Sequence, residues 1–199
     1  SDDAIAATLL AWQGGMEGGL ATADILCGDV NPSAKLTDTF ASRLEDYPST
    51  EHFHEPDQYV EYNEDIYMGY RYFETIPGAY DKVNYEFGFG LSYTEFDFRV
   101  VQTELIENQI QIRVEVTNVG DYTGREVLQL YVKAPEGKLG KPAKQLVAFA
   151  KTRELAVGET QMVNLICHIN DLASYDDQGL VCQSAWVMEA GSYRFFVGN

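Results

Sequence analysis

The stretch Ile110-Gln111-Ile112-Arg113-Val114-Glu115-Val116 decides how the second half of this sequence folds. Its apolar and polar side chains alternate, and successive side chains of a β-strand point to opposite faces of a sheet. The stretch therefore predicts a strand with one buried and one solvated face. The turn signals Asn118–Asp121 and Tyr122–Gly124 follow it, and Val127–Val132 then predicts another strand.

The same pattern of short strands and turns continues to the end of the chain. No strong helical pattern competes with it after residue 96. Several short strands within about 100 residues are typical of an antiparallel β-sandwich. The further expected strands are 96–100, 145–151, 160–167, 184–189 and 191–197.

The first half of the sequence shows different residue patterns. Residues 4–27 carry a helical pattern that Gly14-Gly15 interrupts, and Gly28 is expected to end the second of the two helices. Residues 36–60 are polar and predict a long irregular loop, while the aromatic, glycine-rich stretch Phe87–Tyr93 favours neither helix nor strand. The first half is therefore expected to need a partner to complete its core, whereas the second half is expected to be self-sufficient.

Charge also separates the two halves. The 199 residues contain 31 acidic and 14 basic side chains, for a net charge of −17. Residues 1–98 hold 19 acidic and 4 basic side chains, and residues 99–199 hold 12 and 10. Because an acidic surface repels phosphate backbones and anionic lipids, we expect neither a nucleic-acid nor a membrane partner. No apolar stretch approaches the roughly 18 residues that a membrane-spanning helix needs.

The three cysteines and three histidines show no metal-ligand spacing, and we expect neither a metal nor a cofactor. An odd number of cysteines leaves at least one thiol unpaired, which favours a reducing, cytoplasmic location, although secretion of the whole protein stays open. A disulfide between Cys167 and Cys182 stays open, although two buried free thiols are the simpler expectation. His52 and His54 lie among acidic residues, and we interpret this segment as a solvated loop rather than a metal site.

Several motifs, in the same order, resemble those of glycoside hydrolase family 3 enzymes of the β-glucosidase type. Leu10–Gly19 and Ala23–Pro32 resemble the helix and turn near the end of that family's α/β sandwich domain. Glu64–Phe73 resembles the family's GYRY segment, and Phe87–Thr94 resembles the signature before its last domain. One departure is Ala34, where the family usually has glycine. Stretches that resemble the fibronectin-III-like domain are Val116–Gly120, Gly124–Val132, Pro142–Phe149, Leu155–Glu159 and Glu189–Tyr193.

The resemblance implies an α+β fold overall, with a partial α/β segment followed by an antiparallel β-sandwich. Residues 1–95 would be the C-terminal portion of the α/β sandwich domain, and residues 96–199 the fibronectin-III-like domain. The family's nucleophile is an Asp on a (β/α)8 barrel, and its acid/base Glu lies in an earlier segment of the α/β domain. Neither matches a position in this sequence, so no catalytic residue is carried over. The expected partners are therefore the barrel, on either side of this chain, the rest of the α/β domain, and a β-glycoside substrate.

Four residues of the tyrosine-rich stretch are candidates for substrate binding: Glu64, Asp65, Tyr67 and Arg71. Carboxylates can act as general acids and bases, and tyrosine rings can stack on the apolar faces of sugars. The competing interpretation is structural. In that case Glu64 or Asp65 pairs with Arg71, and the tyrosines pack between domains.

The leading hypothesis is that this chain is the non-catalytic portion of a retaining glycosidase. Two alternatives stay open. A stand-alone carbohydrate-binding module predicts sugar affinity of this chain alone, and an interaction module predicts a tight protein complex without glycosidase activity. A fragment is expected to expose an apolar patch where the absent domain belongs, and a homodimer through that patch is a further expectation.

Overall fold

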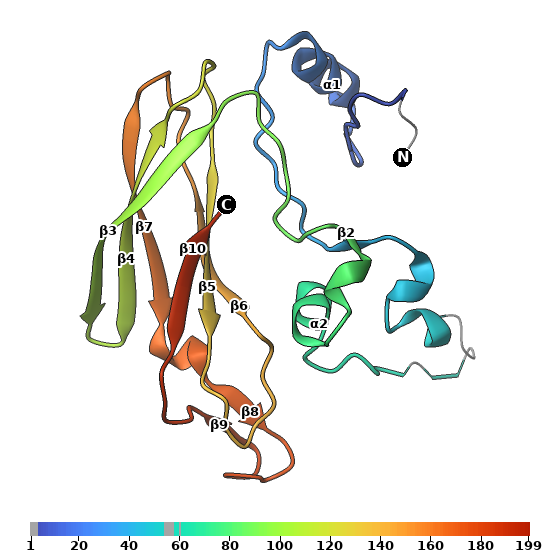
Figure 1. Cartoon of the computed structure of the whole chain (residues 1–199), viewed down its shortest axis with the longest axis vertical. Helices are drawn as coiled ribbons and strands as arrows, with labels where there is room; N and C mark the ends of the chain where they lie inside the picture. Colours follow the sequence, from blue (N-terminus) through green and yellow to red (C-terminus); the bar gives the residue numbers. More distant parts are fainter. Residues whose placement is uncertain (1–3, 54–57, 60) are drawn as a thin grey trace.

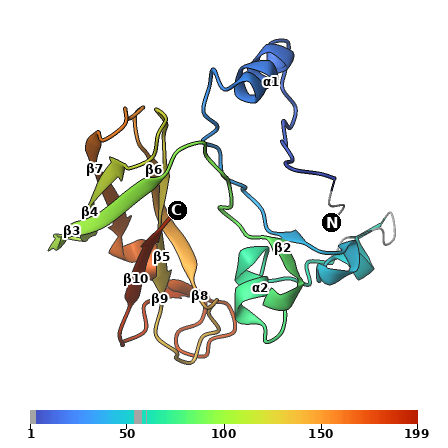
Figure 2. The same cartoon turned by 45° about the horizontal axis from the view of Figure 1, so that its top comes forward.

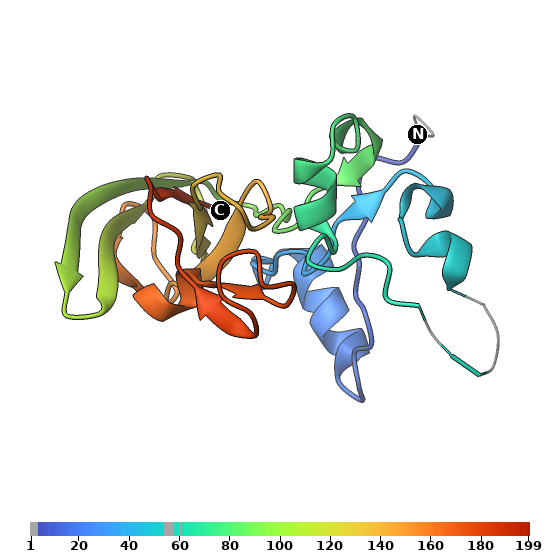
Figure 3. The same cartoon turned by 90° about the horizontal axis from the view of Figure 1, so that it is seen from below.

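The computed structural model describes residues 4–53, 58–59 and 61–199. Two regions lie side by side, as Figures 1 and 3 show: an irregular N-terminal region, residues 4–93, and a β-sandwich, residues 96–199. Short helices occur in the first region and antiparallel strands dominate the second. The α+β fold expected from the sequence is confirmed.

The described part of the N-terminal region contains two short α-helices and a small sheet. Helix α1 spans Gly18–Cys27 and helix α2 spans Tyr70–Thr75. Strands β1 (Phe40–Ala41) and β2 (Val83–Tyr85) pair antiparallel. Single turns of 3-10 helix, at residues 44–46, 50–52 and 80–82, lie between these elements.

Of the two helices predicted in residues 4–27, the second is confirmed as α1 and the first is absent. It ends at Gly28, whose φ of 83° is left-handed and whose N–H caps the last turn, as predicted. The helix predicted before Gly14 is absent, and residues 5–12 have no regular structure. A short helix is marginal without a packing partner, and Ile5 and Trp12 are 63% and 70% exposed.

The sandwich consists of two three-stranded antiparallel sheets and a two-stranded hairpin. One sheet has the order β3-β4-β7, the other has the order β10-β5-β6, and β8 pairs with β9. The bounds are Phe96–Ile106 (β3), Gln109–Asn118 (β4), Val127–Lys133 (β5), Gln145–Lys151 (β6), Thr160–His168 (β7), Ser174–Asp176 (β8), Ala185–Val187 (β9) and Arg194–Gly198 (β10).

The core lies between the two sheets. In β4 the alternation read from the sequence holds, because Ile112, Val114 and Val116 are buried while Arg113 is exposed. Facing strands add side chains that are also inaccessible, and burying each large apolar side chain contributes roughly 1.5–3 kcal/mol. The remaining buried members of this core are Leu128, Leu130, Val132, Leu155, Val163, Leu165, Cys167 and Leu172.

Strand β3 is irregular in the middle. Its pairing with β4 shifts register between Val100 and Gln102, which is a β-bulge. Beyond the bulge, Leu105 and Ile106 are 65% and 45% exposed. β3 is also an edge strand of its sheet in the described part of the chain.

A buried asparagine fixes the point where the chain enters the sandwich. The side chain of Asn118 is fully buried, accepts a hydrogen bond from Thr94 Oγ1 (2.7 Å) and donates to the carbonyl of Leu155 (2.9 Å). Its amide also donates to the carbonyl of Tyr122 (2.7 Å). Strand β3 begins just after this contact, at Phe96. The domain boundary between residues 95 and 96 stays a prediction.

Candidate functional site

The four predicted binding residues lie where a turn leads into α2. The N–H of Tyr67 donates to the carbonyl of Glu64 (2.9 Å), and Asp65 between them has a left-handed φ of 51°. Arg71 is the second residue of α2. The backbone therefore brings the four into one short segment, with Glu64, Tyr67 and Arg71 partly buried and Asp65 exposed.

The expected ion pair between Arg71 and Glu64 or Asp65 is not present among the described residues. The guanidinium carbon of Arg71 instead lies 6.0 Å from the ring centroid of Tyr70. The hydroxyl of Tyr67 faces the sandwich at Gly140, where an added Cβ would lie 3.3 Å from it. These contacts favour a packing role for Tyr67, and sugar binding by the four residues stays a prediction.

Helix α2 docks on strands β5 and β6 of the sandwich. The hydroxyl of Tyr70 accepts a hydrogen bond from the N–H of Leu146 (2.8 Å), and Thr75 Oγ1 accepts one from the N–H of Ala143 (2.8 Å). The Tyr70 ring packs edge-on against Tyr131, with centroids 5.9 Å apart. The helix thus satisfies backbone donors at the start of β6 and just before it.

Charged groups also contribute to the contact between α2 and the sandwich. Lys144 Nζ lies 3.1 Å from a carboxylate oxygen of Glu74 and 4.9 Å from the ring centroid of Tyr131. Burial raises the pKa of Glu74, and the hydrogen bond from Lys144 opposes that shift. Burial also raises the pKa of the Tyr131 hydroxyl.

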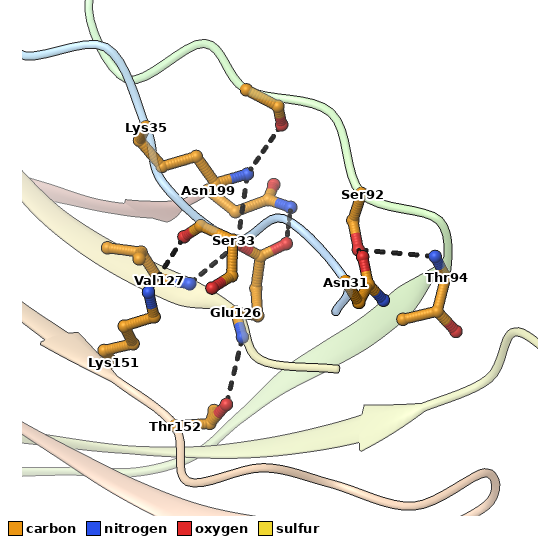
Figure 4. Close-up of polar contacts among 11 residues, drawn as sticks. Asn31, Ser33, Lys35, Ser92, Thr94, Glu126, Val127, Lys151, Thr152 and Asn199 are labelled. Atoms are coloured by element: carbon orange, nitrogen blue, oxygen red, sulfur yellow. Dashed lines mark hydrogen bonds and ion pairs between the residues drawn. The ribbon is translucent and has the colours of Figure 1, made fainter. Parts of the chain in front are cut away.

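A second contact uses residues 31–36, which we call the strap. Asn31 Oδ1 accepts hydrogen bonds from Ser92 Oγ and from the N–H of Tyr93, both at 2.9 Å. Its amide donates to the carbonyl of Thr123 in the sandwich (3.1 Å). Leu36 exchanges two backbone hydrogen bonds with the aromatic loop, residues 87–93. The strap therefore joins the aromatic loop to the sandwich, as Figure 4 shows.

A buried ion pair lies at the centre of this contact. Lys35 Nζ is 3.1 Å from Glu126 Oε1 and donates to the carbonyl of Gly90, also at 3.1 Å. Glu126 is 4% exposed, and its carboxylate also accepts hydrogen bonds from the N–H of Val127 (2.7 Å) and from Asn199 Nδ2 (3.0 Å). Each carboxylate oxygen therefore has at least one donor (Figure 4).

Sequence reasoning missed the Lys35–Glu126 pair, although two glycines signalled a close contact. A Cβ on Gly90 would lie 2.3 Å from the carbonyl oxygen of Ala34, so only glycine fits there. Gly88 has a left-handed φ of 84°, and a Cβ there would meet the side chain of Gln129 at 2.6 Å. The glycine-rich pattern showed that some backbone approaches this loop, but it did not show which one.

The N-terminal region also presents apolar surface to solvent. Helix α1 has no buried residue, and Figure 2 shows it standing apart from the sandwich. Met16 is 99% exposed, and Leu20 and Leu26 are exposed by more than half, at 66% and 69%. Large exposed apolar side chains of this kind are candidates for an interaction surface.

The cysteines differ from the expectation of two buried thiols. Cys167 is buried, and burial raises its pKa to about 11. Cys182 is exposed in the loop whose N–H groups donate to the carboxylate of Asp176, and Cys27 is exposed on α1. No disulfide joins these three cysteines, and the cytoplasmic location stays a prediction.

The described residues show neither a candidate metal site nor a membrane-spanning helix. They contain no group of three or more His, Cys, Asp or Glu side chains that could hold a metal ion. His52 Nδ1 lies 3.7 Å from Glu61 Oε2, and His54 is outside the described residues. None of the helices in the described part of the chain is long and apolar enough to cross a bilayer.

Family models match both regions. Residues 1–93 match the glycosyl hydrolase family 3 C-terminal domain, and residues 126–199 match the fibronectin type III-like domain. A β-glucosidase A from Butyrivibrio fibrisolvens is 57% identical over 213 residues, and a β-glucosidase from Ruminococcus albus is 45% identical over 194. The alignments cover 100% and 97% of this chain but only 26% and 20% of those two proteins.

Solved structures agree with the sequence relatives. A β-glucosidase from Paenibacillus barengoltzii is similar with a TM-score of 0.90 and 52% identity, over 94% of this chain and 20% of that one. β-Glucosidase 3B from Thermotoga neapolitana, solved with glucose, gives a TM-score of 0.86 and 42% identity, over 95% and 26%. This chain therefore spans about a fifth to a quarter of the relatives that it matches.

The paired domains and these matches define the class as part of a glycoside hydrolase. The family resemblance predicted from the sequence is confirmed. The chain belongs to glycoside hydrolase family 3.

Proposed function

We propose that the whole protein is a retaining β-glycosidase of the β-glucosidase type and that this chain is a non-catalytic portion of it. One observation carries the proposal: the alignments cover 100% and 97% of this chain but only 26% and 20% of two β-glucosidases. A retaining mechanism needs two carboxyl groups about 5–5.5 Å apart across the scissile bond. Neither of the family's two carboxyl groups has a matching position in this sequence.

The missing partners in this proposal are the (β/α)8 barrel and the rest of the α/β domain. The exposed apolar side chains of α1 support the proposal, because they need an apolar partner. The self-sufficient core of the sandwich gives the N-terminal region a rigid support. When the rest of the protein is absent, self-association through the α1 surface is the corresponding proposal for this chain.

Hydrolysis of p-nitrophenyl β-glucoside tests the function. We expect turnover by the whole protein and none above the blank by this chain alone. In the whole protein, Glu64→Gln and Asp65→Asn are expected to leave kcat within about threefold of the parent, since structural roles are favoured for them. Turnover by the isolated chain, abolished by either substitution, would overturn the proposal.

Sugar affinity separates this function from a stand-alone carbohydrate-binding module. Titration calorimetry of this chain with cello-oligosaccharides is expected to show no binding at millimolar ligand. Tyr175→Ala on the exposed β8–β9 hairpin provides a variant that would remove stacking on an aromatic ring. Binding lost in this variant would favour the module.

A further inference from the structure

We propose that Lys35 is a positioning residue that fixes the N-terminal region against the sandwich through its buried ion pair with Glu126. In this proposal the pair sets the geometry of the two regions in this chain. The effect on catalysis rests on the function proposed above. The positioning itself does not, because it can be measured without any substrate.

The first argument is burial. The Lys35 and Glu126 side chains are 13% and 5% exposed, so both charges have left bulk water. Removing a charge from water is costly unless a partner and further hydrogen bonds compensate for it. The ammonium has the Glu126 carboxylate and the carbonyl of Gly90, and the carboxylate has Lys35, a backbone N–H and Asn199. Each charge therefore depends on the other to remain buried.

The second argument is the number of segments that meet at this pair. Lys35 extends from the strap and contacts the aromatic loop at Gly90 (Figure 4). Glu126 immediately precedes β5, and its backbone exchanges two hydrogen bonds with Thr152 just after β6. Asn199 brings in the C-terminal end of β10. One ion pair thus joins the strap and the aromatic loop to strands β5 and β10 and to the segment after β6.

The third argument is the orientation that neighbouring contacts impose. Asn31 holds one end of the strap to Thr123, and Lys151 Nζ donates to the carbonyl of Ser33 (3.1 Å). These contacts are more exposed and involve one sandwich residue each. They align the strap along the sandwich, and Lys35 is the strap residue that brings a full charge into the buried contact. Helix α1 ends four residues before Asn31, so the strap also sets where α1 lies.

Replacing only Lys35 is therefore expected to destabilise this contact more than replacing both Lys35 and Glu126. Lys35→Met leaves the Glu126 carboxylate buried and facing an apolar side chain, so the strap and the loop are expected to open. Lys35→Met combined with Glu126→Leu removes both charges and retains apolar volume, which can be nearly neutral for a buried pair. A pair that only adds packing would not show this compensation.

Hydrogen exchange of this full chain, followed by mass spectrometry of peptides, tests the proposal. Lys35→Met is expected to accelerate exchange in residues 31–36 and 87–93 by about 100-fold. Exchange in β4 is expected to stay within about twofold of the parent. The double variant Lys35→Met/Glu126→Leu is expected to recover most of the protection. Arg99→Met is the matched control, because it removes one cation that is 71% exposed and whose partner Glu115 is itself partly exposed.

Two outcomes would overturn the proposal. One is exchange in Lys35→Met that remains within twofold of the parent in both segments. The other is faster exchange that includes β4 and is not restored in the double variant, which would make Lys35 a general stability residue.

The same variants in the whole protein test the consequence for catalysis. Lys35→Met is expected to lower kcat for p-nitrophenyl β-glucoside more than it changes KM, and the double variant is expected to recover activity. If the unsubstituted whole protein has no activity, the proposed function fails. The exchange result for Lys35 stands or falls independently of that.

Discussion

The two regions of this chain show how differently one polypeptide can use its apolar residues. Twelve of the fourteen buried apolar side chains among the described residues lie in the sandwich, and only Phe73 and Ala79 lie in the N-terminal region. The N-terminal region is not poor in such residues, because it exposes Trp12, Met16 and Leu20. Apolar content alone therefore does not make a core. A facing surface is needed, and the sandwich supplies its own because its second sheet covers the first.

The largest expected effect comes from comparing equivalent leucines in the two regions. Leu165→Ala in the sandwich core is expected to lower the free energy of unfolding by about 2–5 kcal/mol, since Leu165 is 1% exposed. Leu20→Ala on α1 is expected to change it by less than about 0.5 kcal/mol. Urea unfolding followed by circular dichroism measures both. Equal effects would mean that α1 is packed in solution.

The second largest difference between the two regions is expected in the reactivity of their cysteine thiols. Cys27 on α1 and Cys182 are exposed, whereas Cys167 is buried with its pKa raised to about 11. Because the thiolate is the reactive form, Cys167 is expected to react with iodoacetamide at pH 8 at least about 100-fold more slowly than the other two. Peptide mass spectrometry gives the three rates. Similar rates for Cys27 and Cys167 would contradict the contrast in burial.

Acid is expected to loosen one part of the sandwich before the rest. Burial is the largest influence on Asp176 and raises its pKa, but the N–H groups of residues 179–182 together outweigh it and lower the pKa below 3.8. A carboxylate with a lowered pKa stabilises the fold above its unfolded pKa, and that stability is lost as the pH falls through the folded pKa. Fluorescence of Trp186, across the hairpin, is therefore expected to change below pH 3.8.

Asp176→Asn is the matched variant for this acid transition. An amide has one acceptor oxygen in place of two, so the variant is expected to show the altered fluorescence already at neutral pH and little further change in acid. A parent-like signal in the variant would show that Asp176 does not hold the hairpin.

The smallest effects on stability are expected at the surface ion pairs, which are at least partly solvated in both regions. Arg99–Glu115 lies on the sandwich and Lys82–Asp46 lies in the N-terminal region, and both pairs are at least partly solvated. Surface ion pairs contribute little to stability. Arg99→Ala and Lys82→Ala are therefore expected to leave the unfolding midpoint within replicate error. A clear loss in only one of them would reveal a difference between the regions that burial does not explain.

The sequence predicted the sandwich well because alternation is a local signal. Burial along β4 follows the alternation of the seven-residue stretch, and β5, β6, β7 and β10 lie within a few residues of their predicted bounds. Strand β8 was missed, because it has only three residues and Tyr175 at its centre is half exposed. A strand of three residues is too short to show a periodic pattern, even though its partner β9 is the next strand in the chain.

The contact between the N-terminal region and the sandwich was much less predictable from the sequence. The Lys35–Glu126 pair joins residues 91 positions apart, and neither belongs to a periodic pattern. The helix predicted before Gly14 failed for a related reason, since its pattern required a surface that the described residues do not provide. Local pattern predicts elements, whereas contacts between elements depend on the whole topology.

The bulge in β3 affects how this chain can pair with other copies of itself. An edge strand offers unpaired N–H and C=O groups to any other strand, and a long, straight, apolar edge is a template for aggregation. β3 is eleven residues long and exposes Val100, Leu105 and Ile106. The register shift between Val100 and Gln102 bends the strand and interrupts its ladder. A second chain can therefore pair with only a few residues at a time, which keeps this edge from seeding a continuous intermolecular sheet.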